Sequence, residues 1–315
     1  MASLTQLRYA VAVAHHHSFQ RAASACFVTQ PTLSMQLKKL ESELGVVLFD
    51  RSRKPVAPTG DGVRLLAQFR RVLSEVDRIG ELCQELKGGL SGTFRLGILP
   101  TIAPTLLPRI VSRFRATYPA VQLRIEELTT DEITHRLLEE TLHAGILATP
   151  LLDLRINEAP VGRESFVVFH APTLSIPTTP QGEARVCDLP MDRLLLMREG
   201  HCLRAQILDL CTLPRTDTPQ QVVLEAGSLA TLTRVVMGGP YFTILPAMAA
   251  QELREQGLGG QLRPLQAPVP YRQVSVVSHR TEIRRAIREA LVATCTAVFS
   301  ELSAVSLAAA PVPPR

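Results

Sequence analysis

The chain has 315 residues, of which 46% are hydrophobic and 20% charged, as expected for a globular protein of two or three domains. It contains no run of about 18 uncharged apolar residues, which argues against a membrane span. The N-terminus also lacks the basic and apolar segments of a secretion signal. Six cysteines in a chain of this length do not make a disulfide scaffold. We therefore expect a cytoplasmic protein without a membrane partner.

The net charge of +5 lies mostly at the N-terminus. The first 60 residues contain seven Lys or Arg and three acidic residues, whereas the rest of the chain is almost neutral. A basic segment on a neutral body indicates a polyanionic partner such as nucleic acid. Many solvated surfaces are also basic, so the interpretation depends on the fold of this segment.

Three short helices are predicted within the first 45 residues. Apolar residues at helical spacing predict a helix over 4–15, and Ser18 can cap a second helix over 19–24. Thr29 is the predicted N-cap of a third helix, which Gly45 ends. The predicted inward stripe of this third helix is Leu33, Leu37, Leu40 and Leu44.

A short hairpin is predicted next, from segments 46–49 and 55–58. Its loop, residues 50–54, reads Asp-Arg-Ser-Arg-Lys and would place positive charge against phosphate or the minor groove. Two helices joined by a tight turn and followed by a hairpin are typical of a winged helix-turn-helix. The alternative is a small helical core with solvated lysines. Three consecutive histidines, residues 15–17, would point in different directions on a helix, so we interpret them as a helix end.

This head resembles the winged helix-turn-helix of LysR-type transcriptional regulators. The resemblance is carried by Phe19, Ala22, Ala23, Thr29–Ser34, Leu40–Glu41, Leu44–Gly45, Leu48–Phe49, Arg51 and Thr59–Gly62. It implies that the third helix reads the DNA major groove and that the basic loop forms the wing. Many LysR relatives have Arg at the position of Met35. The predicted DNA-contacting residues are Thr29, Gln30, Pro31, Thr32, Ser34, Lys38, Arg51 and Arg53.

Residues 60–90 carry an a/d heptad pattern, and such a seam needs a partner helix. The seam residues are Leu65, Phe69, Val72, Val76, Ile79, Cys83 and Leu86. We interpret the segment as a dimerising linker helix, which LysR-type proteins also use; the alternative is an amphipathic helix packed on its own domain. Gly88, Gly89 and Gly92 indicate a hinge. A two-fold dimer would read two DNA half-sites, and the resemblance implies a homotetramer.

Strand-like and helix-like segments alternate between residues 92 and 303, which predicts α/β subdomains with largely parallel sheets. Predicted strands lie at 93–99, 121–128, 145–148, 166–170, 194–197, 222–225, 242–245 and 273–278. Predicted helices lie at 105–117, 131–142, 228–237, 246–255 and 281–302. Residues 304–315 are expected to form a flexible tail.

The resemblance to LysR-type regulators extends over this body. It implies an α/β fold in which the winged helix-turn-helix and long linker helix precede two subdomains like those of periplasmic binding proteins. The implied divisions are a DNA-binding domain at 1–60, a linker helix and hinge at 61–91, and a regulatory domain at 92–303, with subdomain I at 92–163 plus 268–303 and subdomain II at 164–267.

The segment from Glu199 to Cys211 contains two cysteines nine positions apart. If this segment is helical, Cys202 and Cys211 lie about 13 Å apart, too far for a disulfide unless the segment refolds. Its Gly-His-Cys-Leu-Arg core and its spacing resemble the peroxide-sensing loop of the OxyR-type regulators. The resemblance implies that hydrogen peroxide oxidises Cys202 and that Cys211 then forms the disulfide. It also implies a peroxide pocket lined by Thr101 and Thr130.

The neighbours of Cys202 fit this chemistry. The thiolate is the reactive form of cysteine, and nearby cations or a helix N-terminus lower the thiol pKa. His201 and Arg204 are the expected activating groups. Relatives often have an acidic residue where this chain has Ala205. The cysteines interpreted as structural are Cys26, Cys83, Cys187 and Cys295.

We therefore predict a DNA-binding activator of oxidative-stress genes with hydrogen peroxide as its signal, no cofactor and no metal. Expected partners are double-stranded DNA, further copies of the chain, RNA polymerase and a cellular disulfide reductant. One alternative is a LysR-type regulator that binds a small organic effector while both cysteines stay inert and buried. Another is a thiol peroxidase or disulfide oxidoreductase. A zinc site from His201, Cys202 and Cys211 lacks the usual paired spacing.

Overall fold

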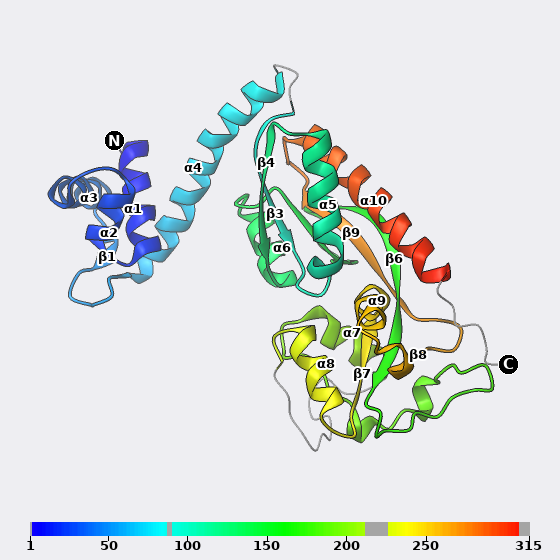
Figure 1. Cartoon of the computed structure of the whole chain (residues 1–315). Helices are drawn as coiled ribbons and strands as arrows, with labels where there is room; N and C mark the ends of the chain where they lie inside the picture. Colours follow the sequence, from blue (N-terminus) through cyan, green and yellow to red (C-terminus); the bar gives the residue numbers. More distant parts are fainter. Residues whose placement is uncertain (1, 87–89, 212–225, 309–315) are drawn as a thin grey trace. The chain divides into compact units, whose positions relative to one another are not determined.

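The computed structural model describes residues 2–86, 90–211 and 226–308 (Figure 1). It divides into two compact units, Met1–Lys87 and Gly88–Arg315. Each unit has its own buried apolar side chains, so each can be understood by itself. Within the described residues, no helix has the length and apolar character needed to cross a bilayer.

The first unit begins with three helices, α1 (Leu4–His16), α2 (Phe19–Ala25) and α3 (Gln30–Leu44). Their boundaries follow local capping chemistry, as predicted. The side chains of Ser18 and Thr29 accept hydrogen bonds from backbone N–H groups of the helices that they precede, and Gly45 ends α3 in the left-handed conformation. The predicted inward stripe of α3 holds except at its last residue, because Leu44 at the end of the helix is 36% exposed.

The predicted hairpin is present but shorter than expected. It consists of β1 (Phe49–Asp50) and β2 (Ala57–Pro58), paired antiparallel, and residues 51–56 connect the two strands. Arg51 ties this wing to α3, because its guanidinium pairs with Glu41 at 2.8 Å and donates to Ser34 Oγ at 3.3 Å. The wing is therefore positioned by α3 itself.

The long helix α4 (Gly60–Leu86) follows the wing. Leu66 and Phe69 are buried in the core of the first unit, with Leu65 and Val72 packed partly against it. Ile79, by contrast, is 64% exposed. The first half of the predicted seam thus contributes to the core of the head. Leu66, which the heptad pattern omitted, is only 1% exposed.

The second unit contains a seven-stranded sheet in the order β4-β3-β5-β9-β6-β7, with β8 also paired to β6. The strands are β3 (Gly92–Ile98), β4 (Val121–Glu127), β5 (Ala144–Thr149), β6 (Ile156–His170), β7 (Phe242–Pro246), β8 (Leu262–Pro264) and β9 (Tyr271–His279). Only β3 with β4 and β3 with β5 pair in parallel among these strands. The prediction of largely parallel sheets is wrong for β6 and β9, because these strands are not linked to their neighbours through helical crossovers.

The helices of this unit are α5 (Ala103–Thr117), α6 (Thr130–Leu138), α7 (Cys202–Leu210), α8 (Leu229–Met237), α9 (Ala247–Glu255) and α10 (Arg285–Ala308). Short 3-10 helices lie at Val186–Asp188, Met191–Arg193 and Gly259–Gln261. Helices α5 and α10 lie side by side, joined by an ion pair of 2.7 Å between Arg113 and Glu301 (Figure 1). Helix α6 packs where Gly97 and Gly145 leave room for Ile133.

Three further predictions need correction. Segment 194–197 is not a strand, because Leu194 and Met197 each form only a single bridge. Helix α10 continues through Ala308, so the flexible tail predicted from residue 304 begins too early. The predicted strand at 222–225 lies outside the described residues.

Two separate clusters of buried side chains fill the second unit. The first core is formed mainly by residues between 94 and 161 and between 274 and 302. The second core is formed by residues between 166 and 265. Strand β6 belongs to both, since Val161 is in the first core and Phe166 in the second. Strands β6 and β9 therefore connect the two cores.

Candidate functional site

Cys202 is the first residue of α7 and lies where the two cores meet. Its neighbour Leu203 is buried in the second core, whereas the half-buried Cys202 packs against the first. As the first helical residue it lies at the end where backbone N–H groups are unpaired, and this end carries partial positive charge. Helix N-termini are frequent binding sites for anions.

Cys211 caps the opposite end of α7. Its backbone N–H donates to Ile207 O at 2.9 Å, and its side chain belongs to the second core. Burial raises the pKa of the Cys211 thiol to about 11, so this thiol is protonated at neutral pH. Both cysteines are free, and the intact helix separates their Cα atoms by about 13 Å. A disulfide between them requires α7 to unwind.

His201 is the N-cap of α7, and burial together with Arg198 lowers the pKa of its imidazole. The ring is therefore neutral at pH 7, unlike the cation expected from the sequence. Arg198 Nε donates to His201 Nε2 at 3.3 Å, which leaves the ring proton on Nδ1. His201 can thus act as a neutral hydrogen-bond donor, while the positive charge near this helix end comes from arginine.

Arg198 and Arg204 supply that charge. Arg204 is half-buried, and its Nη1 donates to Met197 O at 3.3 Å. The charge of Arg198 helps to lower the pKa of Glu132, which lies near the start of α6. The loop before α7 therefore lies close to the N-terminal end of α6, whose first residue is Thr130.

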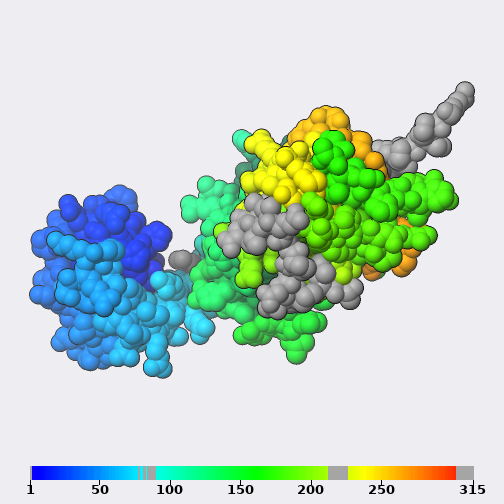
Figure 2. All heavy atoms as spheres, turned by 90° about the horizontal axis from the view of Figure 1, so that it is seen from below, coloured from blue at the N-terminus to red at the C-terminus, as the bar shows by residue number. Residues whose placement is uncertain are grey.

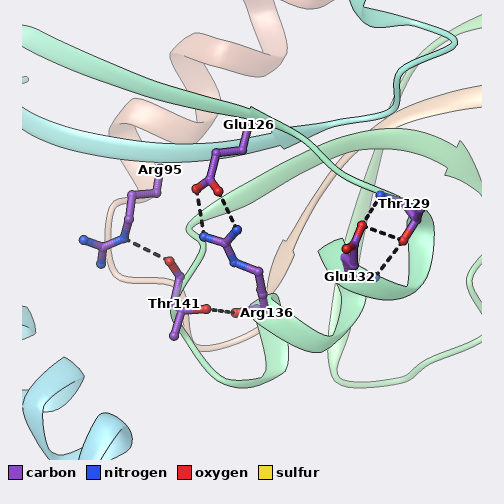
Figure 3. Close-up of polar contacts among 6 residues, drawn as sticks. All are labelled: Arg95, Glu126, Thr129, Glu132, Arg136 and Thr141. Atoms are coloured by element: carbon purple, nitrogen blue, oxygen red, sulfur yellow. Dashed lines mark hydrogen bonds and ion pairs between the residues drawn. The ribbon is translucent and has the colours of Figure 1, made fainter. Parts of the chain in front are cut away.

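Thr130 and Thr129 differ in how their hydroxyls are used. Thr129 caps α6 and forms a capping box with Glu132, including a 2.8 Å hydrogen bond to its carboxylate (Figure 3). The Thr130 hydroxyl is buried and has no hydrogen-bond partner within the described part of the chain. A buried hydroxyl without a partner is costly, so it is suited to meet a small polar ligand.

Thr101 is buried after β3 and belongs to a network of charged groups. Its Oγ1 accepts from Arg272 Nη1 at 3.1 Å. Arg272 in turn pairs with Glu164 at 2.7 Å, and both side chains are only 1% exposed. Glu164 also accepts from the backbone N–H of Met248 at the start of α9 at 3.0 Å. This network joins β6, β9, α9 and the loop after β3.

A cavity of about 580 Å³ opens between the segment after β3, the end of β4 and residues of the second core. It is lined from one side by Thr101 and Glu127 and from the other by Ser228, Arg234 and Glu252. Helix α8, yellow in Figure 2, lies at the surface of this unit. The residues lining this cavity include Thr101 but neither Thr130 nor Cys202.

The predicted DNA-contacting residues lie on α3 and the wing. Gln30, Pro31, Thr32 and Lys38 are exposed, whereas Thr29 uses its hydroxyl to cap the helix. In the wing, Arg53 is largely exposed and pairs with Asp50 at 3.0 Å.

Arg51 is more restrained than these residues. Besides its bonds to Glu41 and Ser34, its guanidinium lies 4.9 Å from the ring centre of Phe19. We therefore expect Arg51 to position the wing and Arg53 to be the more available cation. Histidines 15 and 16 end α1 and His17 caps it in the left-handed conformation, as expected for a helix end.

Sequence reasoning missed Arg198, Glu164 and Arg272. Arg272 could have been noticed, because it is a charged residue in the otherwise largely apolar strand that ends at His279. Its partner could not be found that way, because Glu164 lies 108 positions earlier in the chain. Among the described residues, no group of three or more His, Cys, Asp or Glu side chains could hold a metal ion.

Comparison with known families gives two matches. The model of the bacterial regulatory helix-turn-helix protein, lysR family, matches residues 4–63. The model of the LysR substrate binding domain matches residues 87–300. Together these models span most of both units.

Curated relatives of similar length belong to the same family. The hydrogen peroxide-inducible genes activator of Pectobacterium carotovorum subsp. carotovorum is 34% identical over 275 residues, which covers 87% of this chain and 89% of that protein. The DNA-binding transcriptional dual regulator OxyR of Escherichia coli (strain K12) is also 34% identical, covering 87% and 88%.

Solved structures show the same relationship. A full-length OxyR variant from Pseudomonas aeruginosa has a TM-score of 0.74 and 33% identity, covering 94% of this chain and 95% of that one. A hydrogen peroxide-bound OxyR mutant from Corynebacterium glutamicum has a TM-score of 0.59 and 27% identity, covering 100% and 99%. The fold is therefore shared along the whole chain.

Proposed function

We propose that this chain, which belongs to the LysR family of transcriptional regulators and to its OxyR-type branch, senses hydrogen peroxide at Cys202 and activates oxidative-stress genes. The observation that carries the proposal is the unlike setting of two thiols on one helix. Cys202 begins α7 near arginine side chains, whereas Cys211 ends it inside the second core. The peroxide-bound relative and the names of the curated relatives support the proposed signal.

The first proposed step oxidises Cys202. Its thiolate attacks one oxygen of hydrogen peroxide, so that an S–O bond forms while the O–O bond breaks. The departing hydroxide takes up a proton and leaves as water, and Cys202 becomes a sulfenic acid. The hydroxyls of Thr101 and Thr130 and the Nδ1–H of His201 are the groups proposed to hold the peroxide and the leaving oxygen. Hydrogen peroxide is the signal, and the reaction needs no cofactor.

The second proposed step forms the disulfide. The Cys211 sulfur attacks the Cys202 sulfur, an S–S bond replaces the S–O bond, and a second water leaves. Two thiols and one peroxide thus give one disulfide and two waters. While α7 is intact, Cys211 is buried and protonated, so it cannot attack. Unwinding α7 both shortens the distance and returns this thiol to its ordinary acidity.

We propose that remodelling of α7 alters DNA binding by changing how the copies of the chain pack in an oligomer. We propose homodimers that pair through α4, homotetramers built from them, contact with RNA polymerase, and a cellular disulfide reductant that resets the switch. Within the regulatory domain we propose subdomain I at 92–163 plus 268–303 and subdomain II at 164–267, supported by the two separate cores. Because the family consists of transcription regulators, we expect no sustained peroxide turnover.

The experiment is peptide mapping by mass spectrometry after mild peroxide treatment of the full-length protein. We expect a peptide pair linked through Cys202 and Cys211. Cys202→Ser should abolish the response of a reporter gene to peroxide, whereas Cys211→Ser should let the sulfenic acid accumulate without a disulfide. Cys187→Ser, at an exposed cysteine elsewhere, is the matched control and should respond normally. A normal peroxide response of Cys202→Ser would refute the proposal.

A second function is supported by the cavity of about 580 Å³. Peroxide needs only a small part of this volume, and Arg234, Glu127 and Glu252 would suit a charged organic effector. In that case, catalase-treated metabolite extract should alter DNA binding by the Cys202→Ser protein. Filling the cavity with Ala249→Phe should remove this effect, since Ala249 lines it. No effect of the extract on Cys202→Ser would exclude this alternative.

A further inference from the structure

Phe27 is the most exposed of the large apolar side chains described in the chain, at 96%. It lies in the turn between α2 and α3, two residues before the cap of the DNA-reading helix. The neighbouring Val28 packs partly against the core of the head. Val28 therefore packs against the core, and the ring of Phe27 faces solvent.

The backbone holds Phe27 in this position. The N–H of Phe27 donates to Ser24 O at 3.2 Å and the N–H of Val28 donates to Ala23 O at 3.0 Å. These two bonds are the Schellman arrangement that ends many helices. In this arrangement the residue at the position of Phe27 is usually glycine, because it must adopt a left-handed backbone. Phe27 has a φ of 56°, in the left-handed region.

Two features of Phe27 therefore work against stability of the isolated head. A non-glycine residue in the left-handed region is strained, and an exposed aromatic ring gains nothing from burial. Glycine would relieve both. A strained residue with an exposed ring, beside a surface that binds another molecule, points to a role in that binding.

We propose that Phe27 is a DNA-contacting residue that makes an apolar contact with the duplex beside the start of α3, at a thymine methyl group or a deoxyribose. The proposal goes beyond the peroxide switch and rests only on the DNA-binding part of the proposed function. The N-terminal residues of a recognition helix approach the base edges, and the thymine methyl is the apolar group exposed in the major groove. Phe27 adjoins this surface, since Thr29 and Gln30 lie only two and three residues after it.

The outward face of α3 carries a second apolar side chain that fits this interpretation. Met35 is 61% exposed and lies on the side of the helix opposite the buried Leu33 and Leu37. Apolar groups at both places are expected of a head that reads methyl groups and sugars in addition to hydrogen-bonding base edges.

The test uses the reduced, full-length protein and the duplexes that it selects from a randomised library. Phe27→Gly should fold with an equal or higher melting temperature, since glycine suits the left-handed backbone. Its affinity for the selected duplexes should fall about tenfold per head, the effect of losing a partly buried ring. Phe27→Asn, which also tolerates this backbone, should lose affinity similarly.

Leu152→Gly is the matched control. Leu152 is 90% exposed and also has a left-handed φ, of 58°, but it belongs to the second unit. We expect this variant to bind the selected duplexes like the wild type, because its backbone change is the same and its position lies outside the head.

Replacing thymine by deoxyuridine in the selected duplexes identifies the group that is contacted. If the ring meets a thymine methyl, this replacement weakens wild-type binding and leaves Phe27→Gly unaffected. If it meets a deoxyribose, Phe27→Gly stays weaker on both duplexes by the same factor. A folded Phe27→Gly protein with wild-type affinity would overturn the proposal. Failure of the wild type to select any duplex would refute the DNA-binding premise itself, whereas loss of peroxide sensing alone would not affect these measurements.

Discussion

The two cores meet in two places that differ in how well their polar groups are satisfied. Where β6 and β9 connect the cores, Glu164 and Arg272 form a fully buried ion pair whose remaining atoms bond to Thr101 and α9. At α7, Gln206 has a buried carbonyl oxygen without a partner among the described residues. A rearrangement of the first contact would break a buried ion pair and several hydrogen bonds. A rearrangement at α7 would break fewer, because the Gln206 oxygen already lacks a partner.

This difference explains how one oxidation can act locally. The proposed disulfide would unwind α7, a helix with an unsatisfied side chain, and would leave the strands that connect the cores intact. The two cysteines also differ: Cys202 packs against the first core, and Cys211 lies in the second core at the end of the helix that the proposed disulfide would unwind. Three measurements can break or sharpen this comparison.

Glu164→Gln should have the largest effect, because it leaves the buried Arg272 without its counter-charge. We expect the free energy of unfolding to fall by about 3–5 kcal/mol. Denaturant unfolding of the reduced protein measures this. The matched control is Glu126→Gln, whose ion pair with Arg136 is 2.8 Å long but half-exposed, and which should cost about 0–1 kcal/mol. Equal losses in the two variants would mean that the strand connection is no more rigid than the surface.

Alkaline pH should destabilise the fold through Cys211. Burial raises the folded pKa of this thiol to about 11, above the value that it has in the unfolded chain. Its contribution to stability is therefore complete below the unfolded pKa of about 8.5 and is lost as pH rises towards 11. We expect about 1–2 kcal/mol over this interval, allowing for partial solvent contact. Unfolding curves of Cys211→Ala should show a correspondingly smaller loss with pH than the wild type.

Gln206→Met should have the smallest effect and the opposite sign. The change keeps a long unbranched side chain on α7 but removes the buried oxygen without a partner, so the helix should gain about 1 kcal/mol. If α7 must open before Cys211 can attack, the disulfide should form about fivefold more slowly. The rate of sulfenic acid formation at Cys202 should not change. Stopped-flow oxidation with a sulfenic acid trap separates these two steps, and an unaltered disulfide rate would show that opening is not required.

The sequence predicted those features that depend on residues close together in the chain. Helices α2 and α3 were predicted nearly to the residue, because Ser18, Thr29 and Gly45 act on their immediate neighbours. For the segment between the two cysteines the sequence supplied only a condition, that a helix there would keep the thiols apart, and the structure shows that helix as α7. The place of Thr130 in a peroxide pocket came from the family resemblance and stays a prediction; its buried hydroxyl has no partner among the described residues.

Long-range features escaped prediction. The antiparallel pairing of β6 with β9 sets Glu164 opposite Arg272, and no local pattern marks two residues so far apart as partners. The neutral state of His201 also depends on burial and on Arg198, neither of which a motif can supply. For segment 194–197, apolar content predicted a strand, although it forms only single bridges, because short apolar runs are compatible with many buried conformations.

The burial of Leu66 and Phe69 has a mechanical consequence. Because these side chains belong to the core of the head, where α4 packs on α1 and α1 contacts α3, the first half of α4 and α3 move together. A tilt imposed at the far end of this 27-residue helix is therefore transmitted to the DNA-reading surface, with α4 acting as a lever. Over such a length, a few degrees of tilt move the far end by several ångströms, about the rise of one base pair.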